Sequence, residues 1–467
     1  MRAALGIVWP TCLLVLAGYG VLLGLGIVRL TLRSALPALG LAYLAGVCAV
    51  FLVGVALLVA GVGFHLPLFT ATCLVFMVGG VLLGARASSL SREGELGRDP
   101  ALPRVVKPSL TILGLLTAGY LVVLLLAAAV QPMDAWDAWS IWTHKAMLLA
   151  HFDGLPERFF AGPAYGFMQQ EYPLLLPLLE SIHLRAMGEE NQAALHAVPW
   201  LLMVGFVGAL GFLTWRVRSS GAWLATLLLA ALVPGAYWQL KTGYADFPMA
   251  FLLGAGVLSL GLWLRSGQQG ELALASLLLA GAASVKIEAL PMVAFGFVAA
   301  ALLLAHGREW AQLRRVVLAG AGVVLMVMPW LIWLAIHDIR SEVPLADGLT
   351  PSYLIDRLER LWPAMKALSW DLLKQGGWIA PVACLTIALA LRARPDRRIA
   401  AFYLVTAAGA FASVLWVFVV KEEALQSQID NAAGRVVIGS LFILLAGMAQ
   451  LWSESSGRRR VETGGMT

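Results

Sequence analysis

Two aspartates, Asp134 and Asp137, follow an apolar run that is long enough to cross a bilayer, in the sequence QPMDAWDAWSIWTHKAMLLAH. Carboxylates at such a boundary could act as general base on an acceptor hydroxyl group or as metal ligands. Local helix chemistry is the alternative, because Asp134 could cap the next helix and Asp137 could sit in its first turn. The nearby tryptophans, including Trp136, would fix the depth of both acids at the interface.

Three further charged residues interrupt apolar segments. Asp246 opens the segment in KTGYADFPMAFLL, where it could cap a helix, and Lys286 and Glu288 lie in AGAASVKIEALPMVAF. Residues two apart on a helix do not face each other, so Lys286 and Glu288 predict a break in the helix, lined by protein or water. Ionisable residues at this depth indicate function, and a lysine at such a break suits an anionic ligand.

The other candidates lie close to predicted membrane boundaries. Arg435 stands at the mouth of the last apolar segment, where it could bind a phosphate group or simply extend toward water. Glu171 and Tyr172 belong to the sequence QEYP, which could position a substrate, although Tyr172 could equally be a membrane anchor. The candidate substrate-positioning residues are Glu171, Tyr172, Trp136, Tyr244 and Glu288.

The composition places these residues in a membrane protein. Of the 467 residues 60% are hydrophobic and 13% are charged, and a soluble protein of this length could not bury so much apolar surface. Apolar segments of suitable length predict an all-α polytopic membrane protein with about 13 transmembrane helices. They lie near residues 6–28, 36–61, 67–85, 109–130, 194–215, 221–239, 246–264, 272–285, 291–306, 316–336, 376–391, 399–420 and 436–452.

The charge distribution predicts the orientation. If the loop over residues 131–193 faces outward, the inward segments hold 20 of the 33 Lys and Arg residues but only 8 of the 27 Asp and Glu residues. Short inward loops of membrane proteins are rich in Lys and Arg, so the N-terminus is expected outside and the C-terminus in the cytoplasm. The basic balance therefore reflects topology, and we expect no nucleic-acid partner.

Two helices are predicted in the first outward loop. Residues 137–151 have helical apolar spacing, with Trp139, Trp142, Ala146 and Leu149 on one face. Residues 172–187, YPLLLPLLESIHLRAM, predict a second amphipathic helix that begins at a proline. Both segments are too polar to span a membrane, so we expect both to lie along its outer face.

The order of these features resembles that of GT-C fold glycosyltransferases, in particular the protein O-mannosyltransferase-like and aminoarabinose-transferase-like membrane enzymes. In those families a loop acid precedes an amphipathic helix, as in WDAWSIWTHKA, and a YP-type motif opens an apolar helix that ends in Gly-Glu, as in EYPLLLPLLESIHLRAMGEEN. A second acid opens a later span, a lysine follows in a small-residue helix and a basic residue marks the last outward loop, as in GYADFPMA, GAASVKIEAL and Arg435. The resemblance covers residues 109–452.

The chain departs from the family pattern in two respects. Its loop acids follow the fourth predicted span instead of the first, so residues 1–108 are interpreted as three additional N-terminal helices and a cytoplasmic loop. Residues 109–336, with periplasmic loop 131–193, would form the catalytic module, and residues 337–467 the C-terminal loops, helices and cytoplasmic tail. Two aspartates also compete for the role of the family acid, and Asp137 aligns better than Asp134 because it leads the amphipathic helix.

The resemblance implies transfer of a sugar from a polyprenyl-phosphate donor to a glycan, lipid or protein acceptor at the outer face of a bacterial inner membrane. Asp137, or alternatively Asp134, would deprotonate the acceptor, and one displacement would invert the anomeric configuration. Lys286 and Arg435 would bind the donor phosphate, while Asp246 would orient the acceptor or hold the base helix. We expect no required cofactor; some relatives use a divalent metal, so metal dependence stays open.

The main alternative is a polytopic transporter or flippase of a lipid-linked or anionic substrate. It would explain the many spans and the charges within them, but it would also predict two related halves with matching broken helices, which the sequence lacks. The enzyme interpretation predicts that Asp137, Asp246, Lys286 and Arg435 line one outward-opening cavity, with the two cations nearest its lipid side.

Overall fold

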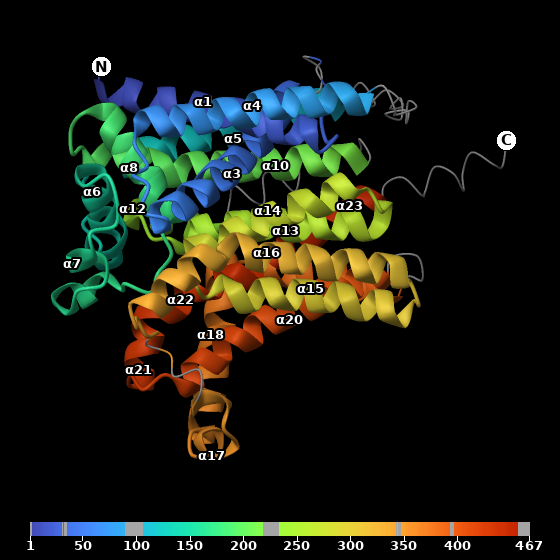
Figure 1. The fold of residues 1–467 in the computed structure, drawn as a ribbon. Helices are drawn as coiled ribbons and strands as arrows, with labels where there is room; N and C mark the ends of the chain where they lie inside the picture. The colour runs from blue at the N-terminus through green and yellow to red at the C-terminus, as the bar shows by residue number, and fades with distance from the viewer. Residues whose placement is uncertain are drawn as a thin grey trace.

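Long helices run side by side through the computed structural model, which describes residues 2–29, 31, 35–88, 106–217, 233–341, 343, 347–392 and 397–455 (Figure 1). No strand occurs among these residues. The long helices are α1 (Arg2–Gly24), α3 (Leu39–Val59), α4 (Leu66–Ser88), α5 (Val106–Ala128), α10 (Ala197–Val217), α13 (Asp246–Ser266), α14 (Gln269–Val285), α15 (Ala289–His306), α16 (Trp310–Ile336), α20 (Arg397–Val420) and α23 (Ile438–Ser455).

The helices are long and apolar enough for an all-α polytopic membrane protein, as the sequence predicts. Within the described ranges, nine helical segments meet the length and hydropathy of a membrane span, or ten if a bent pair counts as one. That pair is α18 (Leu361–Gly376) with α19 (Ile379–Arg392), bent by 101° where we expected one span at 376–391. Two apolar helices are shorter, at Gly114–Ala128 and Gln269–Val285, and most of the span expected at 221–239 falls outside the described residues. The total of 13 therefore stays a prediction.

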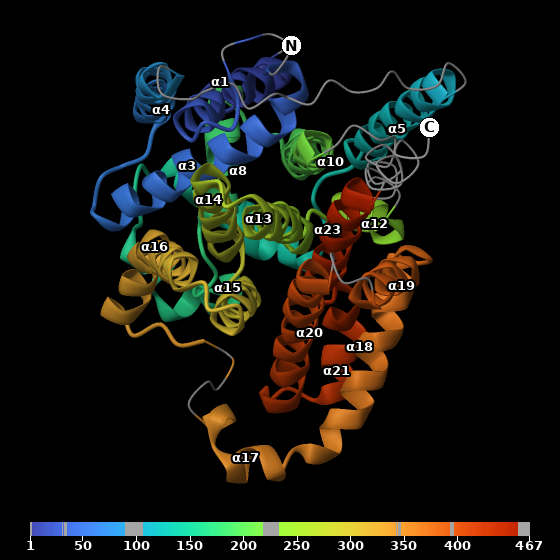
Figure 2. The same cartoon turned by 90° about the vertical axis from the view of Figure 1, so that its right-hand side faces the viewer.

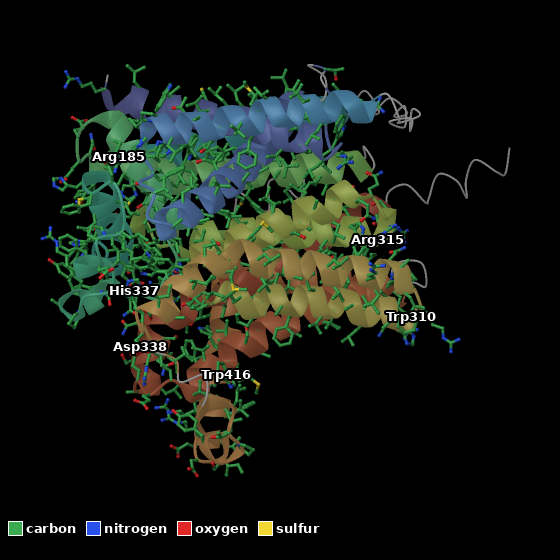
Figure 3. All side chains as sticks on the ribbon, in the orientation of Figure 1. Arg185, Trp310, Arg315, His337, Asp338 and Trp416 are labelled. Carbon is green, nitrogen blue, oxygen red and sulfur yellow. The ribbon has the colours of Figure 1, made fainter. Side chains whose placement is uncertain are left out.

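The bundle has two chemically different ends, which we call the loop end and the arginine end. Figure 3 places His337 and Asp338 at the loop end and Trp310 and Arg315 at the opposite end, so α16 crosses the whole molecule. Ion pairs at the arginine end join Arg216 to Glu271, Arg265 to Glu454 and Arg398 to Glu309. This separation agrees with the predicted sidedness of the loops, while the orientation in the membrane stays a prediction.

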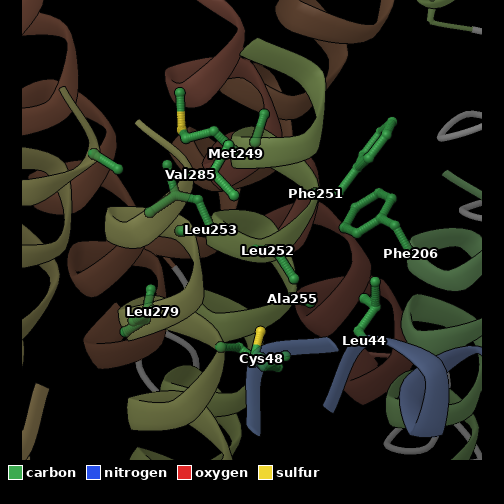
Figure 4. Close-up of a cluster of buried hydrophobic side chains, with 14 of the residues drawn as sticks. Leu44, Cys48, Phe206, Met249, Phe251, Leu252, Leu253, Ala255, Leu279 and Val285 are labelled. Atoms are coloured by element: carbon green, nitrogen blue, oxygen red, sulfur yellow. The ribbon is translucent and has the colours of Figure 1, made fainter. Parts of the chain in front are cut away.

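The centre of the bundle is α13, whose side chains from Asp246 to Leu264 are all buried. Helices α10, α14 and α23 pack around it, and α3 packs against both α10 and α14 (Figure 2). Figure 4 shows apolar side chains from these helices in contact at the centre, among them Cys48 of α3, Phe206 of α10 and Leu279 of α14. The three N-terminal helices thus share one core with the rest of the chain, and the predicted division into three parts is not tested by this packing.

The first predicted loop helix forms, but its register differs from the prediction. A π-helical segment, η2 (Ala138–Thr143), leads into α6 (His144–His151). A π-turn inserts one residue into the helix and rotates the residues before it relative to those after it. Trp142, Ala146 and Leu149 are therefore buried together, whereas Trp139 is 39% exposed and does not share their face.

The second loop helix, α8 (Leu175–Met187), forms, but it is buried by protein and has no exposed polar face, so the prediction of an amphipathic surface helix is wrong in that respect. Its position relative to the membrane stays a prediction. The helix packs against α1, α3 and α6, and its side chains from Leu175 to Leu184 are all buried. The polar residues that made the helix look amphipathic are buried as well, including Glu180 and His183. Burial raises the pKa of Glu180 to about 8, so the helix can be buried without a carboxylate charge at neutral pH.

The backbones of α1 and α4 lie in close contact, and this contact gives a test of helix packing in the bundle. A methyl group added at Gly80 would overlap the Gly20 backbone, whereas one added at the adjacent Gly79 would meet nothing within 4 Å. We expect Gly80→Ala to lower the free energy of unfolding by about 1–3 kcal/mol, a usual cost of overpacking. Gly79→Ala is the matched control and should be neutral or slightly stabilising, because alanine favours a helix. Equal unfolding temperatures of the two variants in detergent would contradict the helix contact.

Candidate functional site

A cavity of about 140 Å³ opens at the loop end, and we call it the ion cavity. Its walls come from the loop segments around Asp137 and Tyr172, the turn between α14 and α15, the outer end of α20, and the short helices α21 (Leu425–Gln428), η6 (Ile429–Ala433) and α22 (Gly434–Val436). The lining residues are Asp137, Tyr172, Lys286, Glu288, Pro291, Ser413, Val414, Val417, Phe418, Lys421, Glu423, Gln428, Ala432, Arg435 and Val436.

The predicted helix break at Lys286 is confirmed. Helix α14 ends at Val285, Lys286 has an extended backbone (φ −140°, ψ 138°), and α15 begins at Ala289. This turn lets the Lys286 Nζ donate to Asp246 Oδ1 at 2.8 Å and lie 3.4 Å from Glu288 Oε1. The Lys286 and Asp246 side chains are only 6% and 2% exposed, so both charges need compensation, which the pair supplies together with Glu288 and Arg435.

Arg435 reaches the same cavity from the opposite wall. Its Nη1 donates to Asp137 Oδ2, and its guanidinium lies over the Tyr244 ring, 4.3 Å from the centroid. The Asp137 side chain makes no capping hydrogen bond, so its partner is this arginine and not its own helix. Asp137 directly precedes the π-helical segment η2, and Arg435 follows the π-helical segment η6 by two residues. Such π-turns occur often at functional sites because they redirect side chains.

Tyr172 joins the loop to the Lys286 turn. Its hydroxyl donates to Glu288 Oε1 at 2.9 Å, and its ring stacks on Trp142 with centroids 5.3 Å apart. The burial of the hydroxyl and the nearby Glu288 carboxylate raise the pKa of Tyr172 well above its usual value, so it remains a donor. The backbone on either side of Glu171 is held by Lys145, whose Nζ donates to the carbonyl oxygens of Gln169 (2.7 Å) and Tyr172 (3.0 Å).

Five predicted site residues do not line the ion cavity, and one of them, Tyr244, contacts it only through Arg435. Asp246 is paired with Lys286 but is not part of the lining, so only three of the four residues predicted to share a cavity line it. Asp134 is exposed, and Trp136 is 60% exposed in an edge-to-face pair with Trp139. Glu171 is buried, and its backbone carbonyl accepts a hydrogen bond from Trp330 Nε1 at 3.0 Å. These positions follow from the π-turn and from the buried turn at residues 169–172, neither of which hydropathy reveals.

The sequence interpretation missed two charged residues of the cavity wall, Lys421 and Glu423. Lys421 Nζ lies 3.2 Å from Glu423 Oε2, just beyond the end of α20. Their signal in the sequence is the cluster KEE directly after a predicted span, at the start of the last outward loop. With them, the lining contains three cations and three carboxylates, and each cation has a carboxylate partner.

The pairing of the cavity carboxylates with cations bears on whether they can bind a metal ion. In the part of the chain that the structure describes, no group of three or more His, Cys, Asp or Glu side chains is arranged to hold a metal ion. The carboxylates of Asp137, Asp246 and Glu288 all face cations, which does not fit a divalent metal site. The arrangement instead suits exchange of a carboxylate for another anion at a cation, with release of that carboxylate as a proton acceptor.

The buried pair makes a stability prediction. Lys286→Met should lower the free energy of unfolding by about 3–5 kcal/mol, because it removes the cation paired directly with the buried Asp246 and leaves it only the charge of Arg435. Adding Asp246→Asn should restore part of that loss by removing the buried charge. Thermal unfolding of both variants in detergent tests this coupling, and a double variant no more stable than Lys286→Met would refute it.

Lys145 makes a prediction about pH. Burial lowers the pKa of Lys145 to about 7, although the nearby Glu171 acts in the opposite direction. In the unfolded chain the lysine keeps its proton up to about pH 10.4, so the folded state gains stability as pH rises from about 7 toward 10. The unfolding temperature of the native protein minus that of Lys145→Met should therefore increase between about pH 6 and about pH 9. A difference that stays constant across this range would show that burial does not perturb Lys145.

Comparisons with known proteins do not assign the chain to a family. A scan against protein-family models, a search of curated proteins and a search of solved structures each found no match to the chain. The GT-C resemblance therefore remains an expectation from the sequence motifs.

Proposed function

We propose that the chain is an integral membrane glycosyltransferase of the GT-C type, with about 13 transmembrane helices. It would move a sugar from a polyprenyl-phosphate donor to a glycan, lipid or protein acceptor at the outer face of a bacterial inner membrane. The observation that carries the proposal is the meeting of Asp137, Lys286 and Arg435 in one cavity, although they lie far apart in the sequence. The ion cavity lies at the loop end and has an apolar wall beside its charges, which suits a substrate that has both a lipid tail and a charged head.

The proposed reaction is a single displacement. An acceptor hydroxyl oxygen attacks the anomeric carbon, the bond from that carbon to the phosphate oxygen breaks, and the acceptor proton passes to the Asp137 carboxylate. Lys286 and Arg435 stabilise the negative charge that develops on the leaving polyprenyl phosphate. Attack from the side opposite the leaving group inverts the anomeric configuration.

The Asp137–Arg435 ion pair suggests an order of events. A donor phosphate that binds Arg435 competes with Asp137 for the same guanidinium, because both are acceptors for its N–H groups. Asp137 would then be released as a base only when the donor is in place. Tyr244 holds the guanidinium from its other side and keeps it in the cavity during this exchange.

The position of the two loop aspartates favours Asp137 as the base. Asp137 lines the ion cavity, whereas Asp134 is exposed outside its lining. Asp246 is proposed to hold Lys286 in place. Tyr172 and Glu288 are proposed to position substrate hydroxyl groups. This assignment replaces acceptor orientation by Asp246, since that carboxylate is paired with Lys286 and does not line the cavity.

The proposal is tested with paired loop variants. Asp137→Asn should lower kcat for sugar transfer at least about 100-fold, as loss of a general base does, while Asp134→Asn should change it less than about threefold. The assay follows release of polyprenyl phosphate from a panel of polyprenyl-phosphate monosaccharides, with purified protein in proteoliposomes and a bacterial envelope extract as acceptor. Unimpaired transfer by Asp137→Asn, or loss in Asp134→Asn alone, would exclude Asp137 as the base.

A transporter or flippase is the second candidate, favoured by the helix break at Lys286, since broken helices bind substrates in transporters. The same proteoliposomes distinguish the two. Movement of the intact donor between leaflets without release of polyprenyl phosphate would support the transporter and contradict the enzyme.

A further inference from the structure

A third cation faces the ion cavity besides Lys286 and Arg435. Lys421 follows the last residue of α20, and its backbone N–H donates to the Val417 carbonyl oxygen at 3.0 Å, so it continues the helix. Its side chain is 27% exposed, compared with 6% for Lys286 and 19% for Arg435. Among these three cations, Lys421 is therefore the one most accessible to a ligand that approaches from outside the cavity.

An apolar stripe leads along α20 to this lysine. Val414, Val417, Phe418 and Lys421 all line the cavity, and their spacing of three, four and seven residues places them on one face of the helix. Val414 and Lys421 are about 10 Å apart along the helix axis. A ligand that matches this wall has a hydrocarbon part along the stripe and a negative charge beside Lys421.

The backbone that carries Lys421 is held by a separate arm of the chain, residues 347–376. Arg360 Nη1 donates to the Lys421 carbonyl oxygen at 2.6 Å, and its Nη2 donates to the Glu423 carbonyl oxygen at 3.1 Å. Arg357 also donates to the Lys421 carbonyl oxygen, at 3.1 Å, and the Tyr353 hydroxyl donates to the Val420 carbonyl oxygen at 2.8 Å. These bonds fix the direction in which Lys421 leaves the end of α20.

The arm also indicates the depth of Lys421. Both ribbon views show α17 (Pro351–Ile355) standing away from the bundle (Figures 1 and 2). Helix α18 leads back from α17 to the bundle and meets α19 at a bend of 101°. The outward face of the arm carries exposed tryptophans, Trp362 and Trp370, next to the exposed Lys366. Tryptophans and lysines on such a face are typical of the headgroup level of a membrane. The arm would thus hold Lys421 at the level of lipid phosphates.

We infer that Lys421 binds the phosphate of an amphipathic phosphate ester whose hydrocarbon chain lies along Val414, Val417 and Phe418. The inference rests on the proposed function, in which this ester is the polyprenyl-phosphate donor. The phosphate takes the place of the Glu423 carboxylate at the Lys421 ammonium. Arg357 and Arg360 are positioning residues, since they act on the ligand through the Lys421 backbone.

The test measures binding of two phosphates to the purified full-length protein in detergent by titration calorimetry. The probes are farnesyl phosphate, a short polyprenyl phosphate, and inorganic phosphate. Lys421→Gln should weaken binding of farnesyl phosphate about tenfold or more, the expected loss for one bond to a charged group. Lys366→Gln, on the outward face of the arm, is the matched control and should change the affinity less than about twofold.

Two further variants keep the test decisive if Lys421→Gln folds poorly. Lys421→Arg keeps the charge and should retain binding, and Glu423→Gln removes the competing carboxylate and should tighten binding severalfold. Unchanged affinity in both Lys421→Gln and Glu423→Gln would overturn the role of Lys421 but leave the proposed function standing. Inorganic phosphate bound as tightly as farnesyl phosphate would overturn the role of the apolar stripe. A native protein that binds neither probe would overturn the proposed function as well.

Discussion

The ion pair between Lys286 and Asp246 is the interaction on which the loop end of this protein depends. Asp246 opens α13, the helix at the centre of the bundle, and its buried carboxylate would lose its direct ion-pair partner if Lys286 were elsewhere. Removing one partner of a buried pair costs several kcal/mol, so the chain must break between α14 and α15 to bring the lysine there. The same turn places Glu288 beside Lys286 and under the Tyr172 hydroxyl.

From this pair the site extends outward by a chain of polar contacts. Glu288 accepts a hydrogen bond from the Tyr172 hydroxyl, and the Tyr172 ring stacks on Trp142. Trp142 belongs to the helix that follows Asp137, and Asp137 accepts a hydrogen bond from Arg435. Five separate parts of the sequence, around residues 137–142, 172, 246, 286–288 and 435, are thus held in one arrangement in which every cation has an acidic partner. Such a cavity is poised to exchange anions, because a phosphate that binds a cation releases the carboxylate that was paired with it. Chemistry and binding would then be coupled through the same ion pairs.

Much of this arrangement could be predicted from local sequence properties. Charges that interrupt or open apolar segments identified Asp246, Lys286 and the helix break at Lys286, because burying an ion is too costly to occur by chance. The alternation of predicted spans placed Asp137, Lys286 and Arg435 on one side, and the structure brings them to one cavity. The orientation predicted from the loop charges stays a prediction. Helix α8 was misjudged because Glu180 and His183 count as surface residues in any hydropathy pattern, whereas burial shifts their pKa values toward the neutral forms.

The features that could not be predicted depend on contacts between distant segments or on small changes in helical geometry. The π-turn at residues 138–143 alters which tryptophans are buried, and hydropathy does not distinguish it from an α-helix. Lys421 and Glu423 looked like ordinary loop charges, since only the folded chain brings the outer end of α20 beside Arg435 and Lys286. The arm at residues 347–376 was expected to be a plain loop, yet its arginines hold the wall of the cavity.

The most direct test is a structure of the protein in lipid nanodiscs, determined by electron cryomicroscopy with a polyprenyl-phosphate sugar whose glycosidic oxygen is replaced by a methylene group. Phosphate density is expected inside the ion cavity, within hydrogen-bond distance of Arg435, Lys286 or Lys421, with the Asp137 carboxylate turned toward the anomeric carbon. Phosphate density at another site, with the Asp137–Arg435 pair intact at saturating ligand, would contradict the proposed mechanism.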